Sequence, residues 1–207
     1  MQESFEVIGG TSLKGTLTPQ GAKNEALQVL CAVLLTQEKV TITNVPNILD
    51  VRKLLDLLKG LGVKIKKIKA NAFTFKADKI DLDFYHSEAF QKDAQRIRGS
   101  VMLIAPLLAR FGRASLPKPG GDKIGRRRLD THLLGFEKLG ATFDFNADEN
   151  VFAINSKNLK GTYIHLEEAS VTGTANIVMA AALAKGKTTI YNAACEPYLQ
   201  QLCKMLN

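Results

Sequence analysis

The stretch Asp50–Ala77, which reads DVRKLLDLLKGLGVKIKKIKANAFTFKA, decides how this chain folds. Four of its apolar residues recur at the spacing of one helix face: Val51, Leu54, Leu55 and Leu58. We therefore expect a helix that runs from Asp50, its N-cap, to Lys59 and stops at Gly60. Two strands follow it and form a hairpin: Val63–Ile68 and Ala72–Ala77.

The same order of elements recurs in the stretch Leu129–Asn155, LDTHLLGFEKLGATFDFNADENVFAIN. Its Leu139-Gly140-Ala141 repeats Leu61-Gly62-Val63 at an offset of 140 − 62 = 78 residues. Around this match we expect a helix and two hairpin strands: Leu129–Lys138, Ala141–Phe145 and Val151–Asn155. A repeat of this length is too long for a thin solenoid and indicates stacked supersecondary units.

An apolar helix and a strand precede each of the two stretches. In the first copy they are expected at Ala22–Leu35 and Val40–Val45. In the second copy they are expected at Asp93–Arg110 and Arg113–Leu116, and Pro106 is expected to kink the helix. Each copy therefore contributes two helices and three strands.

A third copy starts at Val171 and contains a helix, a strand and a second helix: Thr174–Lys185, Lys187–Asn192 and Pro197–Leu206. Asn192 follows Asn44 by 148 residues, which is twice 74. Three further short strands are expected: Ser4–Ile8, Leu13–Thr18 and Thr162–Leu166. The chain stops at Asn207, before a third hairpin. We predict an α/β fold of βαβαββ units with a truncated third unit, and a chain that is a fragment of a longer protein.

Composition narrows the possible partners. The 207 residues carry a net charge of +8 and a sequence pI near 9.4, which suits nucleic acid, anionic membranes or anionic metabolites. The sequence has no tryptophan and no nucleic-acid-binding motif, so an anionic small molecule is the expected partner. Its longest apolar run, Ile177–Ala184, is far shorter than the roughly 20 residues that span a bilayer.

The cysteines and histidines indicate no metal site or cofactor. The three cysteines form no Cys-x-x-Cys pair, and Cys31 lies in an apolar run, where we expect a buried hydrophobic residue. The three histidines are dispersed along the chain. No signal peptide opens the sequence, so we expect a soluble, reduced protein of the cytoplasm that neither spans a membrane nor binds nucleic acid.

The stretch Leu116–His132, LPKPGGDKIGRRRLDTH, is the main candidate for chemistry. Its prolines and glycines exclude a regular helix or strand through Gly125. Asp122 precedes three consecutive arginines, Arg126, Arg127 and Arg128. One carboxylate beside several guanidinium groups suits an anionic substrate that exchanges a proton, although a solvated loop would have a similar composition. A P-loop is rejected, because arginines stand where Lys-Ser/Thr is required.

Three further motifs lie at or near the start of an expected helix. Gly21-Ala22-Lys23-Asn24 supplies a cation and an amide beside free helix N–H groups, although a solvated helix start would look the same. Gln95-Arg96-Ile97-Arg98-Gly99-Ser100 supplies two arginines, of which Arg96 is expected to face solvent. Ser170-Val171-Thr172-Gly173-Thr174 can cap a helix through Ser170 or Thr172, and this role is compatible with ligand binding.

The loop sequence Pro-Gly-Gly-Asp-Lys-Ile-Gly-Arg-Arg-Arg-Leu-Asp-Thr-His resembles the mobile active-site loop of the UDP-N-acetylglucosamine 1-carboxyvinyltransferases, which are enolpyruvyl transferases. That family usually reads Pro-Gly-Gly-Cys-x-Ile-Gly-x-Arg-Pro-x-Asp-Leu-His. The chain departs from it at Asp122, Arg128 and Thr131, where the family has Cys, Pro and Leu. The three helix-start motifs resemble the family's Gly-Ala-Lys-Asn, Thr-Met-Arg-Ala-Ser and Ser-Val-Gly-x-Thr.

The resemblance implies a fold and a reaction. The fold is an inverse α/β barrel, or α-β prism, in which residues 21–207 form the first of two domains. Residues 1–20 would supply strands to the second domain, which is absent. The implied reaction transfers the enolpyruvyl group of phosphoenolpyruvate to the 3-hydroxyl of UDP-N-acetylglucosamine, the first committed step of peptidoglycan synthesis. A complete protein would be required for turnover, so the fragment itself is expected to be inactive.

The resemblance also implies the site residues. Asp122 and Lys23 take catalytic roles. Ten residues bind substrate: Lys23, Asn24, Arg98, Arg127, Arg128, Leu129, Asp130, Thr131, Ser170 and Val171. The family's loop cysteine is alkylated by fosfomycin. Asp122 can still exchange a proton, but a carboxylate is a much weaker nucleophile than a thiolate.

Two alternatives stay open. One is the related shikimate-pathway enolpyruvyl transferase, which typically begins its first helix with Gly-Ser-Lys-Ser. Both Gly21-Ala22-Lys23-Asn24 and the Pro-Gly-Gly loop argue against it. The other is a non-catalytic domain that binds a sugar nucleotide. Turnover measurements distinguish the second alternative from an enzyme.

Overall fold

The computed structural model describes residues 4–85, 87–117, 129–146 and 151–207. Its first unit, residues 23–76, contains three helices: α1 (Lys23–Ala32), the 3-10 helix η1 (Val33–Leu35) and α2 (Leu49–Gly60). Its three strands are β1 (Lys39–Ile42), β2 (Lys64–Lys69) and β3 (Ala72–Lys76). They form an antiparallel sheet in the order β1-β3-β2, so the predicted hairpin is confirmed.

The second unit repeats this plan. Two short helices lead into it: α3 (Leu82–Tyr85) and α4 (Glu88–Ala94). Its helices are η2 (Arg98–Leu103), α5 (Ile104–Phe111) and α6 (Asp130–Lys138). Its strands are β4 (Arg113–Pro117), β5 (Thr142–Asn146) and β6 (Val151–Asn155). The sheet order β4-β6-β5 matches that of the first unit, strand for strand.

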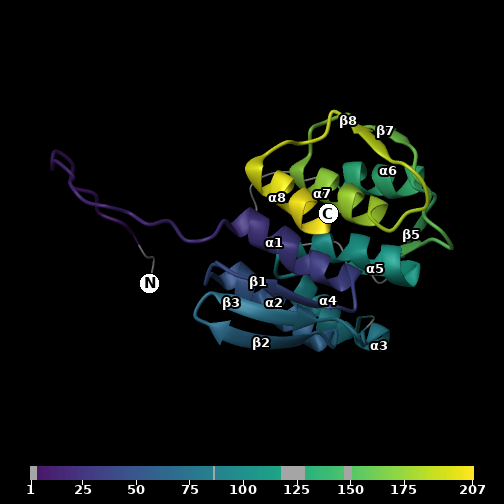
Figure 1. The fold of residues 1–207 in the computed structure, drawn as a ribbon, viewed down its shortest axis with the longest axis horizontal. Coiled ribbons are helices and arrows are strands. Elements are labelled where there is room, and N and C mark those ends of the chain that lie inside the picture. Colours follow the sequence, from purple (N-terminus) through teal and green to yellow (C-terminus); the bar gives the residue numbers. More distant parts are fainter. Residues whose placement is uncertain (1–3, 86, 118–128, 147–150) are drawn as a thin grey trace.

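The third unit has two helices and two described strands: β7 (Tyr163–His165), α7 (Val171–Ala181), β8 (Thr189–Tyr191) and α8 (Pro197–Leu206). β7 and β8 pair in parallel. In Figure 1 the β1-β3-β2 sheet and the β7–β8 pair lie on opposite sides of the molecule, with α1, α5 and α7 between them. A continuous hydrophobic core joins all three units.

Backbone angles confirm the repeat that the sequence predicted. Gly62 and Gly140 both have positive φ values, 91° and 96°, after the helices α2 and α6. Asn44 and Asn192 take φ values of 56° and 57°, which only a few per cent of non-glycine residues adopt. Residues that are 78 or 148 positions apart therefore occupy equivalent places in the units.

Several expectations about secondary structure were wrong. Residues 4–8 and 13–18 form no strand, and their apolar side chains are almost fully exposed. An isolated strand pair has little to stabilise it in water without a sheet or core to pack against. Asp50 does not cap α2, because Ile48 occupies the N-cap position and Asp50 lies in the first turn.

The expected helix Asp93–Arg110 is broken into α4, η2 and α5. Ile97 is extended, with φ −134° and ψ 132°. The Ser100 hydroxyl reaches the carbonyl oxygens of Ala94 and Ile97, at 2.7 and 2.8 Å, and so stabilises the break. Pro106 produces no kink in a long helix, because it lies in the first turn of α5, where its missing N–H is not needed.

Candidate functional site

The first turns of α6 and α7 lie against each other. Thr131 Oγ1 donates to Glu168 Oε1 at 3.2 Å. Ser170 is the N-cap of α7, and its hydroxyl accepts from the Gly173 N–H at 3.2 Å, as the sequence predicted for a cap. A Cβ at Gly173 would lie 2.7 Å from Thr131 Cγ2, so this close approach requires glycine. Two helix N-termini therefore adjoin here, and helix N-termini favour anions.

A buried polar network ties the same two helices together. His132 is only 2% exposed, and its Nδ1 lies 2.8 Å from Asn176 Nδ2 of α7. Its Nε2 lies 3.2 Å from Thr172 Oγ1. Asn176 Nδ2 also donates to the Val101 carbonyl oxygen of η2, at 3.1 Å. Burial, with a smaller contribution from the Arg98 charge, lowers the pKa of His132 to about 4, so the ring is neutral at pH 7.

Arg98 connects this network to the first helix. It is the first residue of η2, and its charge acts on His132. The next residue, Gly99, packs against α1, because a Cβ there would lie 3.0 Å from both terminal methyl carbons of Leu27. The start of η2 therefore lies between α1 on one side and the His132 network on the other.

Lys23 and Asn24 occupy the exposed first turn of α1. Lys23 Nζ forms an ion pair of 2.6 Å with Asp50 Oδ2 in the first turn of α2, with the two side chains 51% and 32% exposed. Among the described residues no side chain caps α1, so its first N–H groups can bind a ligand. Gly21 holds this turn in place, since a Cβ there would lie 1.9 Å from the Asn44 carbonyl oxygen.

The structure thus brings several of the predicted site residues together. Thr131, Ser170 and Val171 lie at the α6–α7 junction, and Arg98 lies beside it. Leu129 is the N-cap of α6, and Asp130 is its first residue. Three predicted site residues lie outside the described part of the chain: Asp122, Arg127 and Arg128. Arg96 pairs with Asp93 at 3.1 Å on the exposed surface, consistent with the expected solvent-facing role.

The sequence prediction missed Glu168 and Asn176, named Thr172 only as a possible helix cap, and gave His132 no role in the site. One signal could have found two of them. Thr172 and Asn176 are spaced i, i+4 on a largely apolar helix, so their side chains share one face. A polar stripe on a buried face requires partners, and His132 is one of them.

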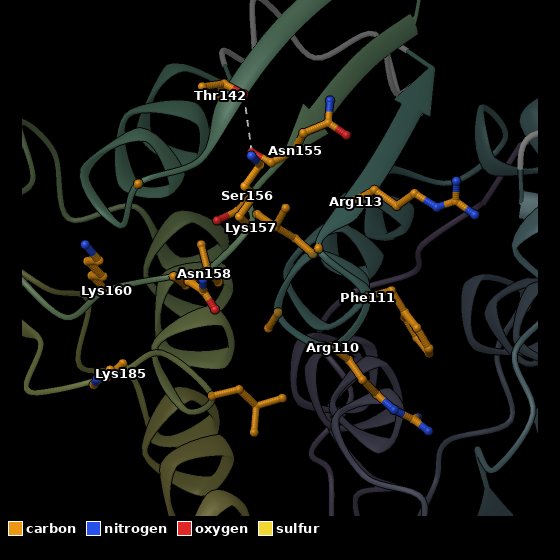
Figure 2. Close-up of a pocket in the computed structure, with 16 residues that line it drawn as sticks. Arg110, Phe111, Arg113, Thr142, Asn155, Ser156, Lys157, Asn158, Lys160 and Lys185 are labelled. Atoms are coloured by element: carbon orange, nitrogen blue, oxygen red, sulfur yellow. Dashed lines mark hydrogen bonds between the residues drawn. The ribbon is translucent and has the colours of Figure 1, made fainter.

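A cavity of about 1110 Å³ lies elsewhere, at the C-terminal ends of α5 and α7. None of the predicted site residues lines it. Figure 2 shows that Arg110 and Arg113 extend to one side of this cavity while Lys160 and Lys185 lie on the other, so the cations do not converge. Arg110 instead donates to the carbonyl oxygens of Leu34 and Thr36, at 3.0 and 3.3 Å. Both residues lie at the C-terminal end of η1.

Two kinds of feature are absent from the described residues. Nowhere in residues 4–85, 87–117, 129–146 and 151–207 do three or more histidine, cysteine or acidic side chains gather as a metal site would require. Within the same ranges, every helix is too short or too polar to cross a bilayer. Cys31 is fully buried, as predicted, and burial raises the pKa of its thiol.

Comparison with known proteins identifies the family. The protein-family model described as EPSP synthase (3-phosphoshikimate 1-carboxyvinyltransferase) matches residues 7–207. A UDP-N-acetylglucosamine 1-carboxyvinyltransferase from Bacteroides fragilis is 59% identical over 204 residues, covering 99% of this chain and 47% of the relative. The protein of the same name from Porphyromonas gingivalis is 58% identical over 203 residues, covering 98% and 47%. The chain spans about half the length of these curated relatives.

Solved structures confirm the fold. The enolpyruvyl transferase NikO from Streptomyces tendae matches with a TM-score of 0.78 at 20% identity, covering 96% of this chain and 45% of that one. EPSP synthase from Acinetobacter baumannii matches with a TM-score of 0.67 at 17% identity, covering 93% and 44%. The chain belongs to the EPSP synthase family of enolpyruvyl transferases.

Proposed function

We propose that this member of the EPSP synthase family forms the first domain of a UDP-N-acetylglucosamine 1-carboxyvinyltransferase. The enzyme would transfer the enolpyruvyl group of phosphoenolpyruvate to the 3-hydroxyl of UDP-N-acetylglucosamine and release phosphate. The observation that carries the proposal is 58–59% identity to proteins of that name over 98–99% of this chain. The arrangement of Thr131 and Ser170 at the adjoining N-termini of α6 and α7, with Arg98 beside them, supports it.

The reaction requires cations and a proton donor. Protonation of C3 of the vinyl group, and addition of the alcohol oxygen at C2 with loss of its hydroxyl proton to a base, give a tetrahedral intermediate. Loss of the C2–O bond to phosphate and of a C3 proton then restores the double bond. We assign Lys23 and Arg98 to the phosphate and carboxylate of phosphoenolpyruvate, and Asp122 to proton exchange at C3. Arg127 would add positive charge around the same groups.

The sugar nucleotide is assigned to the α6 and α7 starts. We place its diphosphate at Ser170 and Val171, where helix N–H groups and the helix dipole favour anions. The segment Arg128–Thr131 would contact the uridine. Asn24 would hold the reacting hydroxyl, since its amide can both donate and accept. Both substrates are cytoplasmic metabolites, so we place the reaction, the first committed step of peptidoglycan synthesis, in the cytoplasm.

The N-terminal segment fits the same proposal. Phe5, Val7 and Ile8 are 101%, 88% and 84% exposed. Exposure of apolar side chains to water is unfavourable in free energy, so a covering partner would stabilise this segment. We assign residues 1–20 to the second domain, where they would pair as strands. The chain alone would then lack both a partner for this segment and the remaining catalytic groups, and would not turn over.

The test compares the chain alone with the chain completed by the remaining half of the Bacteroides fragilis relative. Phosphate release should require both phosphoenolpyruvate and UDP-N-acetylglucosamine in the completed enzyme, and should be undetectable with the chain alone. Fosfomycin should not inhibit, and Asp122→Cys should restore covalent labelling, seen as added inhibitor mass on the loop peptide. Release that depends on shikimate 3-phosphate instead would assign the alternative activity. If the completed enzyme binds the sugar nucleotide but does not turn over, the chain is a non-catalytic binding domain.

A further inference from the structure

The Val101 carbonyl fixes how the Asn176 amide is oriented. Asn176 Nδ2 lies 3.1 Å from the Val101 oxygen and 2.8 Å from His132 Nδ1. An amide nitrogen can only donate, whereas the reversed amide would place its oxygen against the Val101 oxygen. Asn176 therefore uses both amide hydrogens, one for the carbonyl and one for the histidine. His132 Nδ1 must be the acceptor in this pair.

The tautomer of His132 follows from this orientation. A neutral imidazole whose Nδ1 accepts carries its hydrogen on Nε2. His132 Nε2 lies 3.2 Å from Thr172 Oγ1, so it donates to the threonine hydroxyl. The burial that lowers the pKa of His132 keeps the ring neutral at pH 7, so Nε2 remains the donor and Nδ1 the acceptor.

The Thr172 hydroxyl is then left with a hydrogen to donate. Its oxygen accepts from His132, and within the described residues no acceptor meets its hydrogen. Thr172 is the second residue of α7, two positions after the N-cap Ser170, and its side chain is only partly buried. The hydroxyl thus joins the N–H groups of the first turn as a donor, at a position where the pattern that the segment resembles has glycine.

Equivalent positions show that the fold does not need this network. His132 corresponds to Leu54 (132 − 78 = 54) and to Leu202 (54 + 148 = 202), and both leucines are fully buried. A buried leucine suffices on the other two outer helices. A buried histidine with an asparagine to orient it is harder to accommodate than leucine, which favours a role in binding.

We propose, on the basis of the proposed function, that Thr172 determines affinity for the diphosphate of the sugar nucleotide. Asn176 and His132 are positioning residues: they hold the Thr172 oxygen as an acceptor, so that its hydrogen donates to a phosphate oxygen. Arg98 and the first N–H groups of α7 supply positive potential around the same group. The Thr172 hydroxyl adds a directional hydrogen bond to this electrostatic attraction.

The experiment measures binding to the chain by calorimetry, with UDP-N-acetylglucosamine, UDP, uridine and inorganic pyrophosphate as ligands. Thr172→Val, which keeps the shape and removes the donor, should weaken UDP binding about tenfold, as expected for a hydrogen bond to a charged group. Thr172→Ser should remain within about twofold of the unmodified chain. Uridine, which has no phosphate, should bind both variants equally. Unchanged UDP affinity in Thr172→Val would overturn the role of Thr172 and leave the proposed function intact.

A second measurement does not depend on any nucleotide. Nitrogen-15 NMR of the imidazole should show His132 protonated on Nε2, and Asn176→Leu should shift the ring toward the other tautomer. A ring protonated on Nδ1 in the unmodified chain would overturn the proposed relay. If pyrophosphate binds in a Thr172-dependent way but UDP-N-acetylglucosamine does not bind, the donor role stands and the proposed substrate fails.

Discussion

Three outer helices share one equivalent core position but fill it in two different ways. Leu54 on α2 and Leu202 on α8 are fully buried among apolar side chains, whereas α6 has His132 there, 2% exposed and bonded to Thr172 and Asn176. The backbone plan is the same, because the units repeat at offsets of 78 and 148 residues. The difference shows that the unit plan accepts either a leucine or a histidine at this position, while the polar network is specific to the α6–α7 junction.

A second contrast separates this junction from that between α1 and α2. There the link is the Lys23–Asp50 ion pair, which is half exposed, so its loss should change the stability of the chain only slightly. At α6–α7 the link is buried, so removing one partner leaves others without hydrogen bonds. One junction is therefore free to exchange its partner for a ligand, and the other is rigid.

The largest expected effect is a loss of stability in acid that depends on His132. Its pKa is about 4 in the folded chain and about 6.5 when unfolded, because burial disfavours the charged ring. A depressed folded pKa means that stability is complete above pH 6.5 and is lost as the pH falls toward 4. A difference of this size corresponds to about 3 kcal/mol. Urea unfolding measured between pH 7 and pH 4 should show the loss.

His132→Leu, which copies the other two units, should flatten that pH profile, whatever its effect on stability at pH 7. His165→Ala serves as the matched control, since His165 is exposed and the profile should keep its shape. Equal acid dependence in the unmodified chain and in His132→Leu would show that the buried ring is not the titrating group.

A smaller effect is expected one turn later on α6. Gly135 corresponds to Leu57 on α2 (135 − 78 = 57), yet a Cβ at Gly135 would lie 2.3 Å from two carbons of the fully buried Ile177. Overpacking a core costs about 1–3 kcal/mol, whereas alanine favours a helix over glycine by about 1 kcal/mol. Gly135→Ala should therefore destabilise the chain by about 1 kcal/mol net.

The matched control on the same helix is Glu137→Ala, at an exposed position, which should change the free energy of unfolding by less than about 0.5 kcal/mol. Chemical denaturation of both variants provides the comparison. If Gly135→Ala is more stable than the unmodified chain, the α6–α7 approach is looser than its geometry indicates, and the junction would not be rigid.

How far the sequence could predict these features depends on how local their causes are. The Leu-Gly match at Gly62 and Gly140 and the Asn44–Asn192 spacing predicted the repeat, because a left-handed backbone position requires particular residue types. The break at Ile97 was missed, because Ser100 closes it through bonds to residues three and six positions earlier. The His132 network was missed for a similar reason, since its partners lie 40 and 44 residues away.

The smallest effect on stability is expected at the exposed junction, with Lys23→Ala. The change removes only the ion pair to Asp50, so the free energy of unfolding should stay within about 0.5 kcal/mol of the unmodified value. Turnover of the completed enzyme should nevertheless be abolished, because Lys23 is assigned to phosphoenolpyruvate. Asp50→Asn removes the same ion pair from the other side, leaves Lys23 present and should keep turnover. Loss of turnover in both variants would show that turnover requires the Lys23–Asp50 ion pair. Normal turnover in Lys23→Ala would show that Lys23 does not belong to the site.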